Sequence, residues 1–119
     1  MRMPSFEPGD VIKVPFPYTD RATRQRRPAL VVSSGHIEAA HGLLWVLMIT
    51  SAENRRWPDD IAIKGLAQTG LPAPSVVRTA KIAMIEARDA ERLGQVSASV
   101  MAGVQKRLAL MLGSRHFDV

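Results

Sequence analysis

The chain has 119 residues, of which 46% are hydrophobic and 23% are charged, and it contains no cysteine. This length is typical of one domain, and the composition excludes a disordered chain or a coiled coil. The lack of cysteine excludes a disulfide framework, a thiolate nucleophile and a zinc site of the cysteine type. We therefore expect one domain, residues 1–119, that is stabilised by packing alone.

The charge of the chain is carried mostly by arginine. Sixteen basic and eleven acidic residues give a formal net charge of +5, and twelve of the basic residues are Arg. The guanidinium group is a rigid fork of donors that suits phosphate, so a polyanionic partner is one interpretation. The preference of high-GC genomes for Arg over Lys is the alternative.

No segment of the sequence has the pattern of a targeting signal. Residues 1–10 include three charged side chains and lack the apolar core of a secretory signal. The longest uncharged stretch, residues 39–52, is too short to span a bilayer. We expect a soluble cytoplasmic protein with no membrane partner.

The first half of the chain predicts three short strands. Residues 10–14 have the alternating polarity and the branched side chains of a short strand. Residues 29–32 and 43–49 are compact apolar runs, which are typical of strands buried on both faces. Residues 16–27 have no apolar period and include four Arg within seven residues. We expect these residues to form an exposed loop between the first two strands.

The second half predicts three further strands and a helix. The strands are residues 60–64, 75–78 and 81–85. From Ser97 onward, apolar residues recur every three or four positions, which is the spacing of one helix face. Ser97 or Ser99 could cap the start and Gly113 could end the helix, whereas Gly103 inside it suggests a close approach to another element.

Six short strands followed by one helix, without a repeating alternation of the two, predict a mainly β fold. The expected architecture is a small antiparallel barrel or sandwich with the C-terminal helix packed against it. Architecture of this kind does not define a function by itself.

Four motifs follow one another in a set order. They are Gly-Asp-Val at 9–11 with Pro-Phe-Pro at 15–17, Arg-Arg-Pro-Ala-Leu-Val-Val-Ser at 26–33, Ile-Thr-Ser at 49–51, and Ser-Val-Val-Arg at 75–78 followed by Lys81. Together they resemble the MazF/PemK family of toxins from type II toxin–antitoxin pairs, over nearly the whole chain. The resemblance implies an SH3-like β-barrel with a C-terminal helix, the CcdB/MazF-like toxin fold, and a metal-independent endoribonuclease that needs no cofactor.

The candidate catalytic residues follow from that resemblance. It implies that Arg27 and Thr50 are the catalytic pair, with Ser51 beside them. Arg27 precedes Pro28, which restricts its backbone to an extended conformation at the mouth of a buried strand. From the residues alone, a solvated charge at a strand end remains the alternative for Arg27, and hydroxyls bonded to backbone groups remain the alternative for Thr50 and Ser51.

The general base is left unassigned. RNA cleavage without a metal requires that a ribose 2′-hydroxyl lose its proton, that a phosphorane be stabilised and that the leaving oxygen be protonated. Arginine has a pKa above about 12, so we expect Arg27 to stabilise the phosphorane, and to act as a proton donor rather than as an acceptor if it takes part in proton transfer. Some relatives have an Asp at the position of Ala80, and Glu53 is a further candidate whose alternative is a surface charge.

Several basic residues and one aromatic residue are candidate RNA contacts. They are Arg21, Arg24, Arg26, Arg55, Arg56, Trp57, Arg78 and Lys81. The indole of Trp57 could stack on a base or cover the core. An exposed strand face is the alternative for Arg78 and Lys81, and a solvated loop is the alternative for the other Arg residues. His36 and His41 have no suitable ligands at metal-binding spacing, so we expect no metal site.

The resemblance also implies partners. It implies a homodimer, single-stranded RNA as substrate, and a cognate antitoxin whose acidic, disordered tail crosses the basic surface. Two alternatives stay open: a non-catalytic binding module or gyrase-poison-like toxin of the same fold, and a degenerate toxin.

Overall fold

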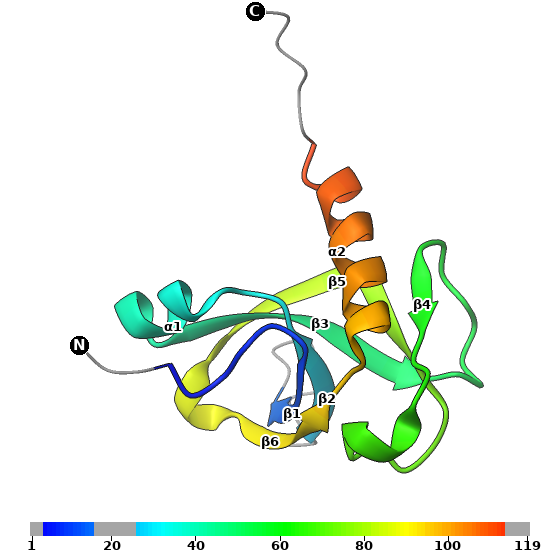
Figure 1. The fold of residues 1–119 in the computed structure, drawn as a ribbon, viewed down its shortest axis with the longest axis horizontal. Helices are drawn as coiled ribbons and strands as arrows, with labels where there is room; N and C mark the ends of the chain where they lie inside the picture. Colours follow the sequence, from blue (N-terminus) through cyan, green and yellow to red (C-terminus); the bar gives the residue numbers. More distant parts are fainter. Residues whose placement is uncertain (1–3, 16–25, 114–119) are drawn as a thin grey trace, which may run out of the picture.

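The computed structural model describes residues 4–15 and 26–113. Within them the chain forms six strands, two α-helices and two short 3-10 helices (Figure 1). In chain order these are β1 (Asp10–Pro15), β2 (Arg26–Val31), α1 (Gly35–His41), β3 (Leu43–Ser51), β4 (Asp60–Ala62), η1 (Leu66–Thr69), β5 (Ser75–Glu86), η2 (Ala87–Asp89), β6 (Glu91–Gln95) and α2 (Ala98–Met111).

The strands form one sheet in the order β4-β5-β3-β2-β1-β6, and every pairing is antiparallel. Figure 1 shows the sheet strongly bent, with α2 standing over it and the last turns of α2 reaching beyond it. The prediction of a mainly β fold with a C-terminal helix is confirmed. Closure into a barrel is incomplete in the described residues, because the end strands β4 and β6 do not pair with each other.

The sheet buries apolar side chains on both faces, because side chains alternate along each strand. On one face, Leu30 of β2 and Leu47 of β3 pack with Val100 and Val104 of α2. On the other face, β1, β2, β3 and β5 contribute a second cluster: Ile12, Val14, Ala29, Val31, Leu44, Val46, Ala83 and Ile85. The central strands are therefore buried on two sides, as their unbroken apolar runs predict.

The predictions of β1 and β3 are confirmed, whereas β2 begins before the predicted 29–32, because Arg26 and Arg27, which were expected in the exposed loop, pair with β1. The third quarter of the chain also differs from the prediction. The strands predicted at 75–78 and 81–85 are one strand, β5, interrupted by a bulge. Leu47 pairs with Ile82 while the next residue, Met48, pairs with Arg78, so three residues of β5 have no counterpart in β3. The strand predicted at 60–64 is shorter, since β4 ends at Ala62.

The C-terminal helix and its cap are confirmed, whereas α1 was not predicted, and the contact at Gly103 is an ordinary van der Waals contact that a Cβ could also make. Ser97 is the N-cap of α2, and its hydroxyl accepts a hydrogen bond of 3.2 Å from the backbone N–H of Val100. Gly103 lies against Ile61 of β4, where an added Cβ would sit 3.8 Å from the Ile61 Cδ1. Among the described residues, no helix is long and apolar enough to cross a membrane.

Candidate active site

The ends of β2 and β3 bring Arg27 and Thr50 to one face of the sheet. Ala29 pairs with Met48 in an antiparallel register, and continuing that register by two residues sets Arg27 opposite Thr50. The recorded pairing stops before Pro28, which has no N–H to donate to a ladder. Because side chains two residues apart on a strand share a face, this register sets Arg27 and Thr50 on the same face as Ala29 and Met48.

Arg27 has a donor that nothing in the described residues satisfies. The side chain is half-buried on the same face as Val14, its neighbour in β1, and its Nε is a buried atom without a hydrogen-bond partner among those residues. Buried donors in folded proteins nearly always have a partner, and a missing one costs free energy. An anionic oxygen entering from the open side of the sheet would satisfy this donor.

The hydroxyl groups of Thr50 and Ser51 have different partners. The Thr50 Oγ1 accepts a hydrogen bond of 2.6 Å from the side-chain amide of Asn54. The Ser51 Oγ accepts one of 3.2 Å from the backbone N–H of Glu53, which is the backbone role considered as its alternative. The Thr50 hydroxyl thus bonds a side chain, whereas the Ser51 hydroxyl bonds the backbone of the turn that follows the strand.

A compact cluster formed by Arg78, Asp60 and Trp57 lies beside this site; we call it the Arg78 cluster. The Arg78 guanidinium donates from Nε and Nη2 to the two Asp60 carboxylate oxygens, at 3.2 and 3.0 Å, and from Nη2 to the Arg55 carbonyl oxygen at 2.7 Å. The Trp57 ring covers it at 4.3 Å. Arg78 and Trp57 were predicted to contact RNA. In the structure, the two side chains contact each other, and Arg78 also bonds Asp60 and Arg55.

Burial and charge act in opposite directions on Asp60. Its side chain is only 1% exposed. Burial raises the pKa of the carboxyl, but the hydrogen bond from Arg78, the backbone N–H of Trp57 and the positive charges of Arg78 and Arg56 together hold the pKa below its ordinary value. Asp60 is thus a carboxylate whose ionised form stabilises the fold.

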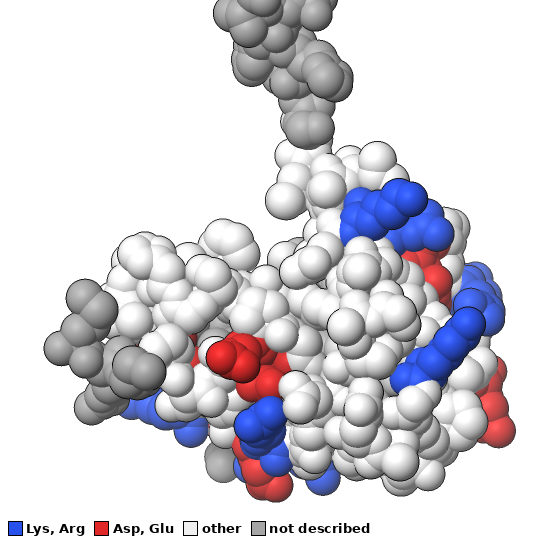
Figure 2. Space-filling view, in the orientation of Figure 1, with Lys and Arg blue, Asp and Glu red and all other residues white. Residues whose placement is uncertain are grey.

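The remaining predicted RNA contacts are scattered around the site. Arg26 is exposed and donates from Nη2 to the backbone oxygens of Lys13 and Asp89, at 3.2 and 2.7 Å. Arg55 and Arg56 lie exposed in the loop between β3 and β4, and Lys81 lies in the β5 bulge. Arg21 and Arg24 fall outside the described residues. Figure 2 shows Lys and Arg gathered beside β4 and α2.

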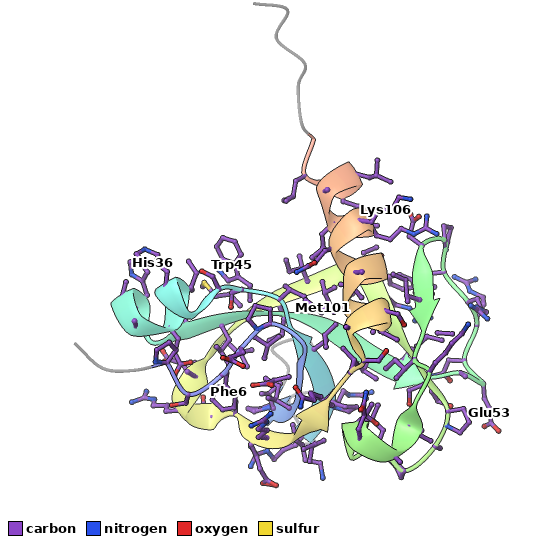
Figure 3. All side chains as sticks on the ribbon, viewed as in Figure 1. Phe6, His36, Trp45, Glu53, Met101 and Lys106 are labelled. Carbon is purple, nitrogen blue, oxygen red and sulfur yellow. The ribbon has the colours of Figure 1, made fainter. Side chains whose placement is uncertain are left out.

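Two residues of the site were missed by sequence reasoning. Asn54 follows Thr50 by four positions, and its place in a polar turn gave a usable signal because Asn side chains bond nearby groups in turns. Asp60 had no such signal, since its partner Arg78 is eighteen residues away. Glu53, the candidate base, lies at the outer edge of the molecule and points away from the sheet (Figure 3).

The fold and the candidate residues together define a class: small, bent antiparallel sheets with cationic and hydroxyl side chains at the ends of two central strands. The family model described as PemK-like, MazF-like toxin of type II toxin-antitoxin system matches residues 7–112. The chain therefore belongs to this family. A comparison with curated proteins finds no match.

Solved structures of the family have the same fold. MazF of Deinococcus radiodurans is 26% identical, with a TM-score of 0.73 over 96% of this chain and 100% of that one. A MazE-MazF complex from the same organism gives 26% identity and a TM-score of 0.72 over 97% of this chain and 100% of that one. An endoribonuclease from a mycobacterial species, in complex with its cognate antitoxin, is 19% identical with a TM-score of 0.71 over 97% and 100% of the two chains, which shows the fold alone.

Proposed function

We propose that the chain is a metal-independent endoribonuclease that cleaves single-stranded RNA, with Arg27 and Thr50 as its catalytic pair and Ser51 next to them. The observation that carries the proposal is the placement of Arg27 opposite Thr50 on one face, with the Arg27 Nε buried and unsatisfied among the described residues. Membership of a toxin family with endoribonucleases among its similar structures supports it and favours it over a non-catalytic module or a gyrase poison.

In this proposal the ribose 2′-hydroxyl loses its proton to an unassigned base as its oxygen attacks the adjacent phosphorus, and the bond to the 5′-oxygen breaks as that oxygen gains a proton. Negative charge accumulates on the phosphorane oxygens, and fixed donors stabilise such charge most when they are positioned before the reaction. Arg27 supplies a permanent cation, because its guanidinium does not lose its proton near neutral pH. Thr50 supplies a hydroxyl donor from the neighbouring strand, and the products are a 2′,3′-cyclic phosphate and a 5′-hydroxyl.

The substrate path in this proposal follows the exposed cations near the site. Arg55 and Arg56 follow Thr50 by five and six residues and lie on an exposed loop. Three further arginines precede Arg27 in sequence: Arg21, Arg24 and Arg26. Single-stranded RNA bound through its phosphates would lose affinity as salt rises, with a slope that grows by about 0.7 for each phosphate neutralised.

A cognate antitoxin is the proposed inhibitor. The related MazF of Deinococcus radiodurans was solved in complex with MazE. A disordered acidic segment would compete with RNA for the same cationic loop, since opposite charges raise the rate of association and fix the register of an interface.

A homodimer is the proposed assembly. Trp45, Ile82 and Met84 form an exposed apolar area on the sheet, and Met84 is 59% exposed. Leu110 and Leu112 are exposed at the end of α2, where the helix leaves the sheet (Figure 1). Large apolar side chains grouped in this way are typical of an interface. Sedimentation of the wild type and Met84→Glu should give a dimer and a monomer; a monomeric wild type would contradict this part.

The nuclease is tested by incubating the purified protein with a mixed RNA pool in EDTA and mapping the new ends. We expect cleavage with 5′-hydroxyl ends by the wild type and much slower cleavage by Arg27→Ala and Thr50→Ala. Intact RNA at every protein concentration would instead point to a binding module.

A further inference from the structure

The Thr50 hydroxyl is the acceptor in a short hydrogen bond from another side chain. The Asn54 Nδ2 lies 2.6 Å from the Thr50 Oγ1 and donates to it. A threonine hydroxyl has one hydrogen and two lone pairs, and the hydrogen rotates to suit its surroundings. Because Asn54 presents a donor, the Thr50 hydrogen turns away from Asn54 and is available to another acceptor.

The backbone holds Asn54 in place on both sides. Its own N–H donates to the Ser51 carbonyl oxygen at 3.1 Å, which closes a turn directly after β3. The carbonyl oxygen of the next residue, Arg55, accepts the 2.7 Å hydrogen bond from the Nη2 of Arg78. Arg78 is itself buried and paired with Asp60, so the segment that carries Asn54 is tied to the body of the fold.

We propose that Asn54 is a positioning residue that sets the Thr50 hydroxyl as a hydrogen-bond donor toward the bound phosphate. This inference rests on the proposed function, because it assigns a direction to a hydroxyl that the proposal places in the site. The donated bond also polarises the Thr50 oxygen, and hydrogen bonds in a chain strengthen one another. Asn54 acts through Thr50 and does not itself touch the substrate.

The Arg78 cluster also holds the loop that carries Asn54. Its hydrogen bond to the Arg55 carbonyl joins a buried ion pair to the residue next to Asn54. Arg78 therefore supports the site from the interior by holding the loop, and its donors to Asp60 and Arg55 are already used.

The first measurement does not depend on activity. In the ¹⁵N-labelled wild-type protein, the side-chain amide resonances of Asn54 are compared with those in Thr50→Ala, and with those in Lys64→Gln as the control, because Lys64 is exposed and lies ten residues away in sequence. We expect a shift of the Asn54 amide in Thr50→Ala and none in Lys64→Gln. An unchanged Asn54 amide in Thr50→Ala would overturn the contact whether or not the protein cleaves RNA.

The second measurement is single-turnover RNA cleavage by four proteins: the wild type, Thr50→Ala, Asn54→Ala and the double variant. We expect Asn54→Ala to lower kcat by about tenfold with an unchanged KM, as for a lost hydrogen bond in the transition state. It should have no further effect in the Thr50→Ala background. Wild-type kcat in Asn54→Ala, or an equal loss in both backgrounds, would contradict the inference; an unaffected Thr50→Ala would contradict the proposed function instead.

The third measurement decides the case even if Thr50→Ala is too slow to measure. Asn54→Asp has nearly the same shape, but its carboxylate accepts the Thr50 hydrogen and withdraws it from the substrate. We expect Asn54→Asp to lose more kcat than Asn54→Ala, and Lys64→Gln, a change at an exposed residue outside the site, to keep the wild-type value. An Asn54→Asp variant as active as the wild type would overturn the assigned direction of the hydroxyl.

Discussion

Arg27 and Arg78 lie in neighbouring parts of one sheet and differ in how their donors are used. Arg78 has hydrogen bonds to both Asp60 oxygens and to a backbone carbonyl, and Trp57 covers its guanidinium. Arg27 keeps its buried Nε without a partner among the described residues. A satisfied guanidinium stabilises the structure, whereas an unsatisfied one is available for a ligand. The following predictions test this difference, beginning with the largest effect.

Removing the Arg27 guanidinium should strongly reduce kcat and leave the fold intact. We expect Arg27→Ala to lower kcat by roughly 100- to 1000-fold, the effect of losing one preorganised donor to a transition-state charge. Its thermal midpoint should stay near that of the wild type, because the Arg27 side chain has no hydrogen-bond partner within residues 4–15 and 26–113. Arg26→Ala is the matched control, and equal losses of kcat in the two variants would remove the distinction between these adjacent arginines.

Removing the Arg78 guanidinium should mainly destabilise the protein. Arg78→Ala leaves Asp60 as a buried carboxylate without its cation, which costs about 3–5 kcal/mol in the free energy of unfolding. Urea denaturation monitored by circular dichroism measures this loss. Arg107→Ala is the control, since its pair with Asp59 is about half exposed and should contribute at most about 1 kcal/mol. A stable Arg78→Ala with impaired RNA binding would reverse the roles assigned to Arg78 and Arg27.

The Asp60 carboxyl should make the free energy of unfolding depend on pH. Its pKa in the folded protein lies below the ordinary value of 3.8, so its stabilisation is present above that pH and is lost as the pH falls through the folded value. We expect Asp60→Asn to be less stable than the wild type at pH 7 and the difference to shrink below about pH 4. Urea midpoints across pH 2 to 7 measure it, and a difference that does not change with pH would contradict the shift.

The exposed loop arginines should have the smallest effect. Arg56→Gln removes one cation, so the slope of log affinity against log salt for single-stranded RNA should fall by about 0.7. Fluorescence anisotropy with a labelled RNA oligonucleotide gives this slope for the wild type and the variant. Lys64→Gln removes a charge from the segment that follows β4 in sequence, and this variant should leave the slope unchanged. Equal changes of slope in both variants would mean that the loop makes no specific phosphate contact.

The fold was predictable where the sequence pattern is local. The apolar runs of β2 and β3 and the cap of α2 at Ser97 depend on neighbouring residues, and the structure confirms them. β6 was missed because Glu-Arg-Leu-Gly-Gln has no apolar alternation. It becomes a strand by pairing with β1, and Arg92 pairs with the buried Asp10 at 3.2 Å.

The proposed site could be predicted only from family motifs. The motifs indicate Arg27 and Thr50 as candidates, and their proposed placement depends on the register of two strands. The burial of Arg78 could not be predicted, because it depends on Asp60 and Trp57, which pairing of β4 with β5 brings beside it. From the sequence alone, Arg78 was one of several candidate RNA-binding cations. The structure shows that its guanidinium is bonded to Asp60 and Arg55.

The central claim is that Arg27 and Thr50 form a site for attack by a ribose 2′-hydroxyl, and a pair of RNA oligonucleotides tests it most directly. One is all-ribose and contains a mapped cleavage position; the other carries a single 2′-deoxynucleotide immediately 5′ to the cleaved phosphate. We predict that the wild-type protein in EDTA converts the first to a 2′,3′-cyclic phosphate and a 5′-hydroxyl end and leaves the second intact. Cleavage of the deoxy-substituted oligonucleotide, or a strict requirement for added metal, would contradict the claim.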